Sequence, residues 1–399
     1  MKPETLSRRT IVFVNIAHAL DHFALLIFPT AVIAMAPDLG RDYAALIGLS
    51  TGAFLAFGFF SLPMGWVAER TGRRNLLAVF FGGIGVALIG LATAASPAAL
   101  AAWLFVLGIF TAIYHPIGSA MLVTHASRLG RDLGWNGVWG NLGAGFASGI
   151  TALLAAWLGW RAAFALPAAI SLGVGVAFLL LVRGDGEGQG AAKTKTPVIP
   201  VARPLLLLTI FAVAIVAGGM TFNVTSISLP KVLDDRLGLT LPLALTGSLA
   251  TGVFLLGALA QLVMGRMVDR YSLPTIFVGL ALLQPLGLGL AALATGVPLL
   301  IGLGLAMAAI YGQVVVNDAM VARYVPPHWR AKAFSVRYFL GFTVSGLAVP
   351  FIALMYAQGD GFPAVLGVTA AFGAVILACA GFFWLVAQGR TRPSGLPAE

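Results

Sequence analysis

The sequence predicts an all-α integral membrane protein with twelve transmembrane helices in two parallel six-helix repeats. The first observation is composition: 59% of the 399 residues are hydrophobic and only 10% are charged, a balance foreign to soluble domains. The second is that apolar stretches of about 20 residues, long enough to cross a hydrocarbon core of about 30 Å, recur along the whole chain. The third is an internal repeat that relates the second half to the first.

Short polar breaks separate the predicted spans. The longest break, 184–203, is rich in Gly, Lys and Pro and has no apolar periodicity, so we expect a flexible cytoplasmic linker there. It divides the chain into an N-terminal six-helix half, 1–183, and a C-terminal six-helix half, 204–399. The predicted spans run over roughly 11–35, 44–66, 75–95, 98–123, 136–158, 162–183, 204–229, 242–265, 274–295, 297–321, 334–356 and 363–387.

The two halves repeat each other at an offset of two hundred residues. Leu49-Ser-Thr-Gly-Ala-Phe-Leu55 returns as Leu249-Ala-Thr-Gly-Val-Phe-Leu255, and Leu62 to Arg70 returns as Leu262 to Arg270. Because each half has an even number of spans, both copies enter the membrane from the same side. They are parallel repeats related by an axis along the membrane normal, which encloses a central cavity between them.

The distribution of charge predicts the topology. With the N-terminus in the cytoplasm, all but four of the 24 Lys and Arg residues fall on the inner side, which is the positive-inside bias of a multi-pass protein. We therefore expect a bacterial inner (plasma) membrane protein with both termini cytoplasmic, and we attribute the net charge of +10 to topology rather than to nucleic-acid binding. The four outer residues are Arg41, Arg161, Lys231 and Arg236.

A motif after the second span carries a family resemblance. Gly65-Trp-Val-Ala-Glu69-Arg70-Thr-Gly72-Arg73-Arg74 resembles the signature loop of the major facilitator superfamily (MFS), with Glu69 where Asp is usual, and Gly265-Arg-Met-Val-Asp269-Arg270 is its second copy. The resemblance covers essentially the whole chain. It implies the MFS fold, a monomer, and gating roles for Gly65, Glu69, Arg70, Arg73, Arg74, Gly265, Asp269 and Arg270.

Three shorter pieces resemble fosmidomycin-resistance-type exporters: His18-x-x-Asp21, Phe110-Thr-Ala-Ile-Tyr114-His115-Pro116 and Gly140-Asn141-Leu-Gly143. Two features common among related transporters are absent. Trp103 to Thr111 has no basic residue where many proton-driven relatives carry arginine, and Ser148 stands where the fifth helix often has proline.

The first predicted helix carries the groups around which we interpret the function. Asn15, His18 and His22 recur at three- and four-residue steps and share one helical face, with Asp21 at its edge. Ionisable groups at membrane depth usually bind ions, protons or substrate. Because desolvation penalises a charged carboxylate, Asp21 is the candidate proton carrier, with His18 or His22 as relay. The alternative is a fixed Asp–His pair that braces the helix.

The fourth span adds Tyr114 and His115, followed by Pro116, which is expected to kink the helix. In the MFS fold the first and fourth helices of each half line the cavity, so the resemblance puts His115 across the lumen from His22. His115 is a candidate for proton coupling, and helix packing is its alternative role.

The second half has amides and hydroxyl groups where the first has an acid and histidines, which predicts uncharged hydrogen bonding to substrate there. Three candidate substrate ligands also have a structural alternative. Asp318 could instead pair with Arg323 or Arg337, and Asn141 could form interhelical hydrogen bonds. Arg337 could instead be a cytoplasmic anchor. The candidate substrate-binding residues of the whole chain are Asn15, Tyr114, Asn141, Asn223, Gln313, Asn317, Asp318 and Arg337.

Several classes of protein are excluded. The chain has no phosphate-binding loop for ATP and no nucleophile beside a base in a recognisable catalytic motif, so we expect neither an enzyme nor a cofactor. No Cys/His cluster has structural-zinc spacing and no metal ligand is assigned, although His18, His22 and His115 could converge on a transition metal ion.

The predicted function is secondary active transport by rocking-switch alternating access, with protons as the coupling ion and export of a drug or metabolite. Import of a nutrient, siderophore or metal complex is one alternative, and a receptor or scaffold that does not transport is another. The expected partners are the lipid bilayer and a small-molecule substrate that is amphipathic or weakly charged.

Overall fold

All regular structure in the described part of the chain is helical. The computed structural model describes residues 3–126, 129–182, 184, 204–238, 241–325 and 327–388. Twelve stretches of this part are long and apolar enough to cross a membrane, which confirms the predicted fold class. The predicted linker lies outside the described residues except for Gly184, so the domain boundaries stay a prediction.

The helices follow one another along the chain as α1 (Pro3–Leu39), α2 (Tyr43–Gly48), α3 (Thr51–Ser61), α4 (Met64–Thr71), α5 (Arg73–Thr93), α6 (Pro97–Thr111), α7 (Tyr114–His125), α8 (Leu129–Leu158), α9 (Ala162–Leu181), α10 (Pro204–Arg236), α11 (Leu243–Arg270), α12 (Leu273–Leu293), α13 (Gly296–Tyr324), α14 (Pro327–Met355), the π-helix η1 (Tyr356–Asp360) and α15 (Gly361–Gln388).

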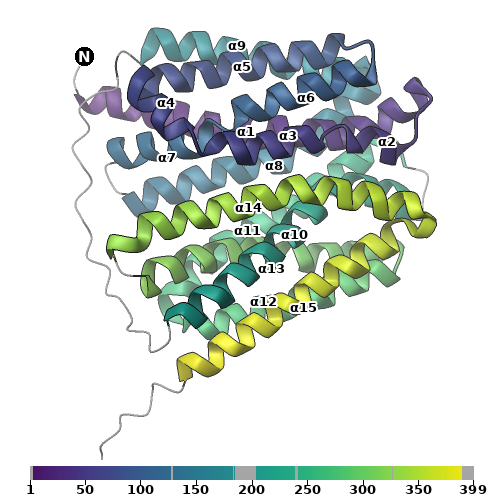
Figure 1. The fold of residues 1–399 in the computed structure, drawn as a ribbon. Helices are drawn as coiled ribbons and strands as arrows, with labels where there is room; N and C mark the ends of the chain where they lie inside the picture. The colour runs from purple at the N-terminus through teal and green to yellow at the C-terminus, as the bar shows by residue number, and fades with distance from the viewer. Residues whose placement is uncertain are drawn as a thin grey trace, which may run out of the picture.

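The helices of each half lie together. In Figure 1 the first half, α1 to α9, occupies one side of the bundle, and the second half, α10 to α15, occupies the other. The halves contact each other chiefly through α3 against α14 and α8 against α11. We name the two ends of the bundle after helices that lie there: the α4 end, where α1 also begins, and the α2 end opposite.

The second and fourth predicted spans are interrupted. The second is divided into α2, α3 and α4, and the fourth into α6 and α7 with a break at Ala112 and Ile113. Pro116 explains the second of these breaks, because it has no N–H to donate to the carbonyl oxygen of Ala112 and its ring clashes with that carbonyl. The predicted kink is confirmed. It sets the direction of α7, whose first two residues are Tyr114 and His115.

Helix α8 packs on both sides through small residues. A Cβ atom at Gly143 would lie 2.0 Å from the backbone oxygen of Ala19 in α1, so only glycine permits this approach. On the other side, the Gly149 N–H donates a hydrogen bond of 3.1 Å to Thr251 Oγ1 of α11. Small residues at close contacts are typical of membrane helices. Helix α8 thus joins the helix that carries His18 and His22 to the second half.

An aromatic and ionic cluster joins the halves at the α2 end. The ring of Tyr43 in α2 lies 5.1 Å from that of Tyr356 and 6.1 Å from that of Phe362, between ring centroids. The Tyr356 hydroxyl donates a 2.8 Å hydrogen bond to Asp235, whose carboxylate also binds Lys231 Nζ at 2.6 Å. A cavity of about 330 Å³ lies beside this cluster. These contacts tie α2 to α10, η1 and α15.

Candidate functional site

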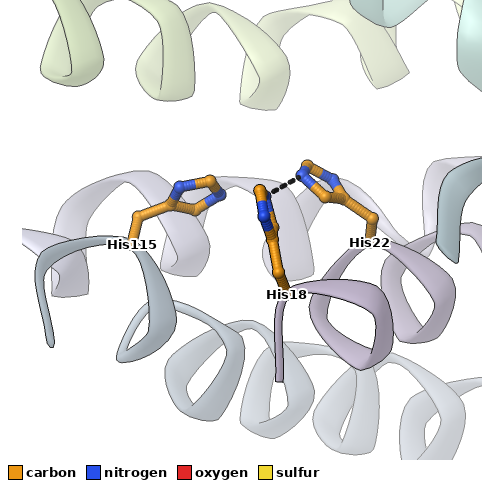
Figure 2. Close-up of side chains that lie close together, drawn as sticks. All are labelled: His18, His22 and His115. Atoms are coloured by element: carbon orange, nitrogen blue, oxygen red, sulfur yellow. Dashed lines mark hydrogen bonds between the residues drawn. The ribbon is translucent and has the colours of Figure 1, made fainter. Parts of the chain in front are cut away.

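Three histidines meet between α1 and α7. The ring centroids are 5.0 Å apart for His18 and His22, 5.5 Å for His18 and His115, and 5.6 Å for His22 and His115. Figure 2 shows the rings pointing toward one another, and its dashed line marks the 3.2 Å hydrogen bond between the Nε2 atoms of His18 and His22. His115 therefore contacts His22 directly, instead of facing it across a lumen as the family resemblance implied.

The ring of His18 is held by a stacked aromatic ring and by a hydrogen bond at one nitrogen. Its Nδ1–H donates a 2.8 Å hydrogen bond to the backbone oxygen of Asn136 in α8, and the ring stacks on Tyr114 with 4.7 Å between centroids. Gly140 leaves room for the His18 ring, because a Cβ atom at this position would lie 2.5 Å from His18 Nε2. Since Nδ1 carries the proton, Nε2 presents its lone pair, and the Nε2–H of His22 donates to it.

Asp21 lies behind the histidines and is fully buried, with 0% of its side chain exposed. Its Oδ2 lies 3.4 Å from Nε2 of His115, and within the described residues neither carboxyl oxygen has a hydrogen-bond partner. The ring of Phe57 packs edge-on against His115, at 5.8 Å between centroids. A carboxylate in such surroundings is costly unless a proton or a cation neutralises it.

Two predicted substrate ligands are part of a buried network that supports the histidines. The Tyr114 hydroxyl donates a 3.0 Å hydrogen bond to Asn136 Oδ1, and Asn136 Nδ2 donates one of 2.9 Å to Asn15 Oδ1. All three side chains are buried. In this conformation Asn15 and Tyr114 position α7 and α8 against α1, and the Asn15 Oδ1 atom and the Tyr114 hydroxyl are already paired.

The second half has a buried amide cluster formed by Thr221, Gln284 and Gln313. The Thr221 hydroxyl donates a 3.1 Å hydrogen bond to Gln284 Oε1, and Gln284 Nε2 donates to Gln313 Oε1. Within the described residues Gln313 Nε2 has no partner. Asn223 Nδ2 donates a 2.8 Å hydrogen bond to the backbone oxygen of Gly219, one turn earlier on α10. Asn317 lies half-buried on α13.

The remaining predicted substrate ligands pair with one another or with the other half. Asn141 Nδ2 donates to Gln261 Oε1 and links α8 to α11, which agrees with the interhelical alternative. Arg337 forms an ion pair with Asp318, which agrees with the pairing alternative for that acid, and its role in substrate binding stays a prediction.

The signature loop lies at the α4 end beside α7. Glu69 and Arg73 line a cavity of about 280 Å³ together with residues of α7, and Arg73 donates a 3.1 Å hydrogen bond to Thr124 Oγ1. Arg74 instead donates to the backbone oxygen atoms of Leu179 and Val182 at the end of α9.

Four of the other predicted gating residues are exposed. The side chain of Asp269 lies outside the described residues. Exposed positions in the two loops are Gly65, Arg70, Gly265 and Arg270.

Sequence reasoning missed several residues of these clusters. Gln261 and Gln284 are each the one amide in a largely apolar span, and a lone polar group at membrane depth is the signal that could have identified them, as it identifies Asp21. Tyr43 and Tyr356 were missed because aromatic residues are common near the ends of membrane helices, and nothing local indicates that these two meet across the halves.

Twelve candidate membrane spans in the described residues, with buried polar clusters in both halves, are typical of a multi-pass membrane transporter. The family model described as Major Facilitator Superfamily matches residues 11–248 and 211–399. The chain belongs to this superfamily of secondary transporters, and it is not an enzyme. The narrower likeness to fosmidomycin-resistance-type exporters is not among these matches. No curated protein sequence matches the chain.

Several solved transporter structures have a similar fold. A bacterial homolog of the human lysosomal transporter Spinster, in an inward-facing and occupied conformation, has a TM-score of 0.78 at 14% identity over 100% of both chains. A POT family transporter in complex with 5-aminolevulinic acid has 0.72 at 15% identity over 96% of both chains. The nucleoside transporter NupG has 0.72 at 16% identity over 94% of this chain and 99% of its own. At this identity the likeness shows the fold.

Proposed function

We propose that the chain is a proton-coupled antiporter that exports a small organic molecule across a bacterial inner membrane. The observation that carries the proposal is the Asp21 carboxyl group. It is fully buried, and in the described part of the chain His115 is the one basic side chain within 4 Å of it. No lysine or arginine there holds the carboxylate permanently charged, so a proton is its simplest neutralising partner.

The histidines supply a route for that proton. His115 Nε2 lies 3.4 Å from the carboxyl group, and the three rings are close enough for protons to pass among them after small rotations. Histidine serves well as a proton shuttle because its charge changes near neutral pH in water. The similarity of the first, fourth and fifth spans to fosmidomycin-resistance-type exporters supports this assignment of Asp21 and His115.

The second half supplies uncharged groups for the substrate. Gln313 Nε2, which has no hydrogen-bond partner among the described residues, is an available donor in the buried amide cluster. Asn223 and Asn317 lie half-buried on α10 and α13. Neutral amides suit a weakly charged organic molecule better than a multiply charged anion. Binding of this molecule and protonation of Asp21 would favour opposite orientations of the two halves.

The two ends of the bundle supply the gates. With both termini in the cytoplasm, the α2 end is the outer end, and the Tyr43–Tyr356–Phe362 cluster is the outer gate, closed in this conformation. Glu69 and Arg73 lie at the inner mouth. Each gate must contribute only a few kcal/mol, about the range over which a ligand can shift a two-state equilibrium.

The test is proton release from the purified full-length chain in weakly buffered detergent as weakly charged organic compounds are added. Wild type is expected to release protons on binding a substrate, and Asp21→Asn is expected to release none. Asp38→Asn is the matched control, because Asp38 lies on the same helix at the α2 end and its Oδ2 accepts a hydrogen bond from Trp160, which asparagine also accepts.

Two results would contradict the proposal. Binding of the same compound to both proteins with no proton displaced would make Asp21 structural and the transport uncoupled from protons. The second result comes from liposomes across which a proton gradient is imposed. Uptake of the compound in the same direction as proton flow, rather than in the opposite direction, would replace export by import.

A further inference from the structure

Imidazole nitrogens from two helices converge at one place. One ring nitrogen from each of His18, His22 and His115 lies within 4.8 Å of the others, and those of His18 and His22 are 3.2 Å apart. Two nitrogen ligands of a tetrahedral zinc ion at bond lengths of 2.0–2.1 Å are about 3.3 Å from each other. One pair is therefore already at the separation that a shared metal ion requires, and the third ring needs only a small rotation.

The orientation of His18 is typical of a metal ligand. Ligating histidines almost always donate their second ring N–H to a backbone carbonyl or a carboxylate, which fixes the tautomer and directs the lone pair at the metal. The 2.8 Å hydrogen bond from His18 Nδ1–H to the Asn136 backbone oxygen does this. Stacking on Tyr114 holds the same orientation.

Asp21 provides the negative charge that such a site needs. Its carboxyl oxygens are completely buried and have no hydrogen-bond partner in the described part of the chain, and one of them lies 3.4 Å from His115 Nε2. A buried carboxylate without a partner is costly, and a nearby dication removes much of that cost. This observation is independent of the convergence of the three rings.

We infer that His18, His22 and His115 bind a divalent transition metal ion, with Asp21 as a fourth ligand or as the carboxylate that orients His115. Three imidazoles and one carboxylate suit Zn²⁺, Cu²⁺ or Ni²⁺, whereas Mg²⁺ and Ca²⁺ prefer oxygen ligands only. The 3.2 Å hydrogen bond between His18 and His22 is then the metal-free arrangement of the site. On binding, the Nε2 proton of His22 must shift to its Nδ1 atom or pass to solvent, so that the Nε2 lone pair faces the metal.

This inference does not rest on the proposed function, because metal binding is measured at equilibrium without transport. The full-length chain is purified in detergent through an affinity tag that contains no histidine and is stripped of metal with a chelator. Zn²⁺ is then titrated in competition with a chromophoric chelator. Wild type is expected to bind one Zn²⁺ per chain, and His22→Gln and His115→Gln are each expected to weaken binding at least tenfold.

His125→Gln is the matched control, because this histidine lies in α7 at the α4 end and its Nδ1 lies 3.3 Å from Ser7 Oγ. It is expected to leave Zn²⁺ affinity unchanged. X-ray absorption of Zn²⁺-loaded wild type needs no variant to fold, and three imidazole ligands are the expected result. Three results would each overturn the inference: no saturable binding by wild type, a Zn²⁺ affinity in His22→Gln and His115→Gln equal to that of wild type, or a spectrum with oxygen ligands only.

Discussion

The two halves share a sequence repeat but differ in the continuity of their helices. The second span is broken twice in the first half, whereas its counterpart α11 is one helix from Leu243 to Arg270. Residues two hundred positions apart explain this. Pro63, which cannot donate to the backbone oxygen of Phe59, is replaced by Val263. Ser50, whose hydroxyl bonds the Ile47 backbone oxygen at 2.8 Å and competes with the helix, is replaced by Ala250.

The fourth span shows the same contrast. The break before Pro116 separates α6 from α7, whereas α13 continues from Gly296 to Tyr324. The broken half holds the buried acid and the three clustered histidines, and the continuous half holds the Thr221–Gln284–Gln313 amide cluster. A break in a membrane helix is costly, because the backbone groups that it frees need other hydrogen-bond partners. We therefore expect such a break where it directs a functional side chain. Here it directs His115 toward α1.

The largest effect is expected from exchanging the residues that cause the difference. Val263→Pro places proline inside the continuous helix α11 and is expected to destabilise the chain by about 3 kcal/mol. Pro63→Val restores a backbone donor at an existing break and is expected to change stability by less than about 1 kcal/mol. The measurement is the free energy of unfolding by detergent titration. Equal costs in both variants would mean that proline does not cause the break.

A smaller effect is expected at the glycine contacts of the two halves. Gly143→Ala brings a Cβ atom to 2.0 Å from the Ala19 backbone oxygen, which forces α1 and α8 apart and is expected to cost about 2–3 kcal/mol. Gly219→Ala in α10 brings a Cβ atom to 3.0 Å from the Val344 side chain. A side chain can move more easily than a backbone, so this variant should lose less stability. Gly145→Ala, with its nearest contact at 3.5 Å, is the control. The order of thermal unfolding midpoints checks this, and a tolerated Gly143→Ala would contradict the close packing.

The smallest effect is expected in the amide cluster. Gln313→Leu leaves Gln284 Nε2 without its acceptor and is expected to destabilise the chain by about 1–2 kcal/mol. The double variant with Gln284→Leu should recover part of this loss, because both members of the pair are then apolar. Free energies of unfolding for the two single variants and the double variant give the coupling. Additive losses of stability would show that the hydrogen bond between Gln284 and Gln313 does not stabilise the chain. Substrate binding would then remain as the role of these two amides.

Much of the fold and the centre of the site could be predicted, because both depend on local patterns. Hydropathy indicates the spans, and helical periodicity places His18 and His22 on one face. Pro116 predicts the break before α7. The breaks at Ser50 and Pro63 were not predicted, although comparing each position with its partner in the other half would have found them.

Contacts between distant residues could not be predicted in the same way. Nothing near Asn141 names Gln261 as its partner, and the pair of Tyr43 with Tyr356 depends on how the halves are docked. The direct contact of His115 with His22 depends on the exact direction of α7, which the family resemblance described only as facing a lumen. Local sequence determines which groups are available, and helix packing decides which of them meet.

The bond between His18 and Asn136 has a thermodynamic consequence for the rest of the molecule. Asn136 lies five residues before Asn141 on α8, about 7.5 Å along the helix axis, and Asn141 bonds Gln261 in the other half. A change of charge at the histidines and a change at the contact between halves thus act on one short rigid segment. Linkage is reciprocal. If occupancy of the cluster shifts the affinity of a ligand beside Gln261, that ligand shifts the affinity of the cluster by the same factor.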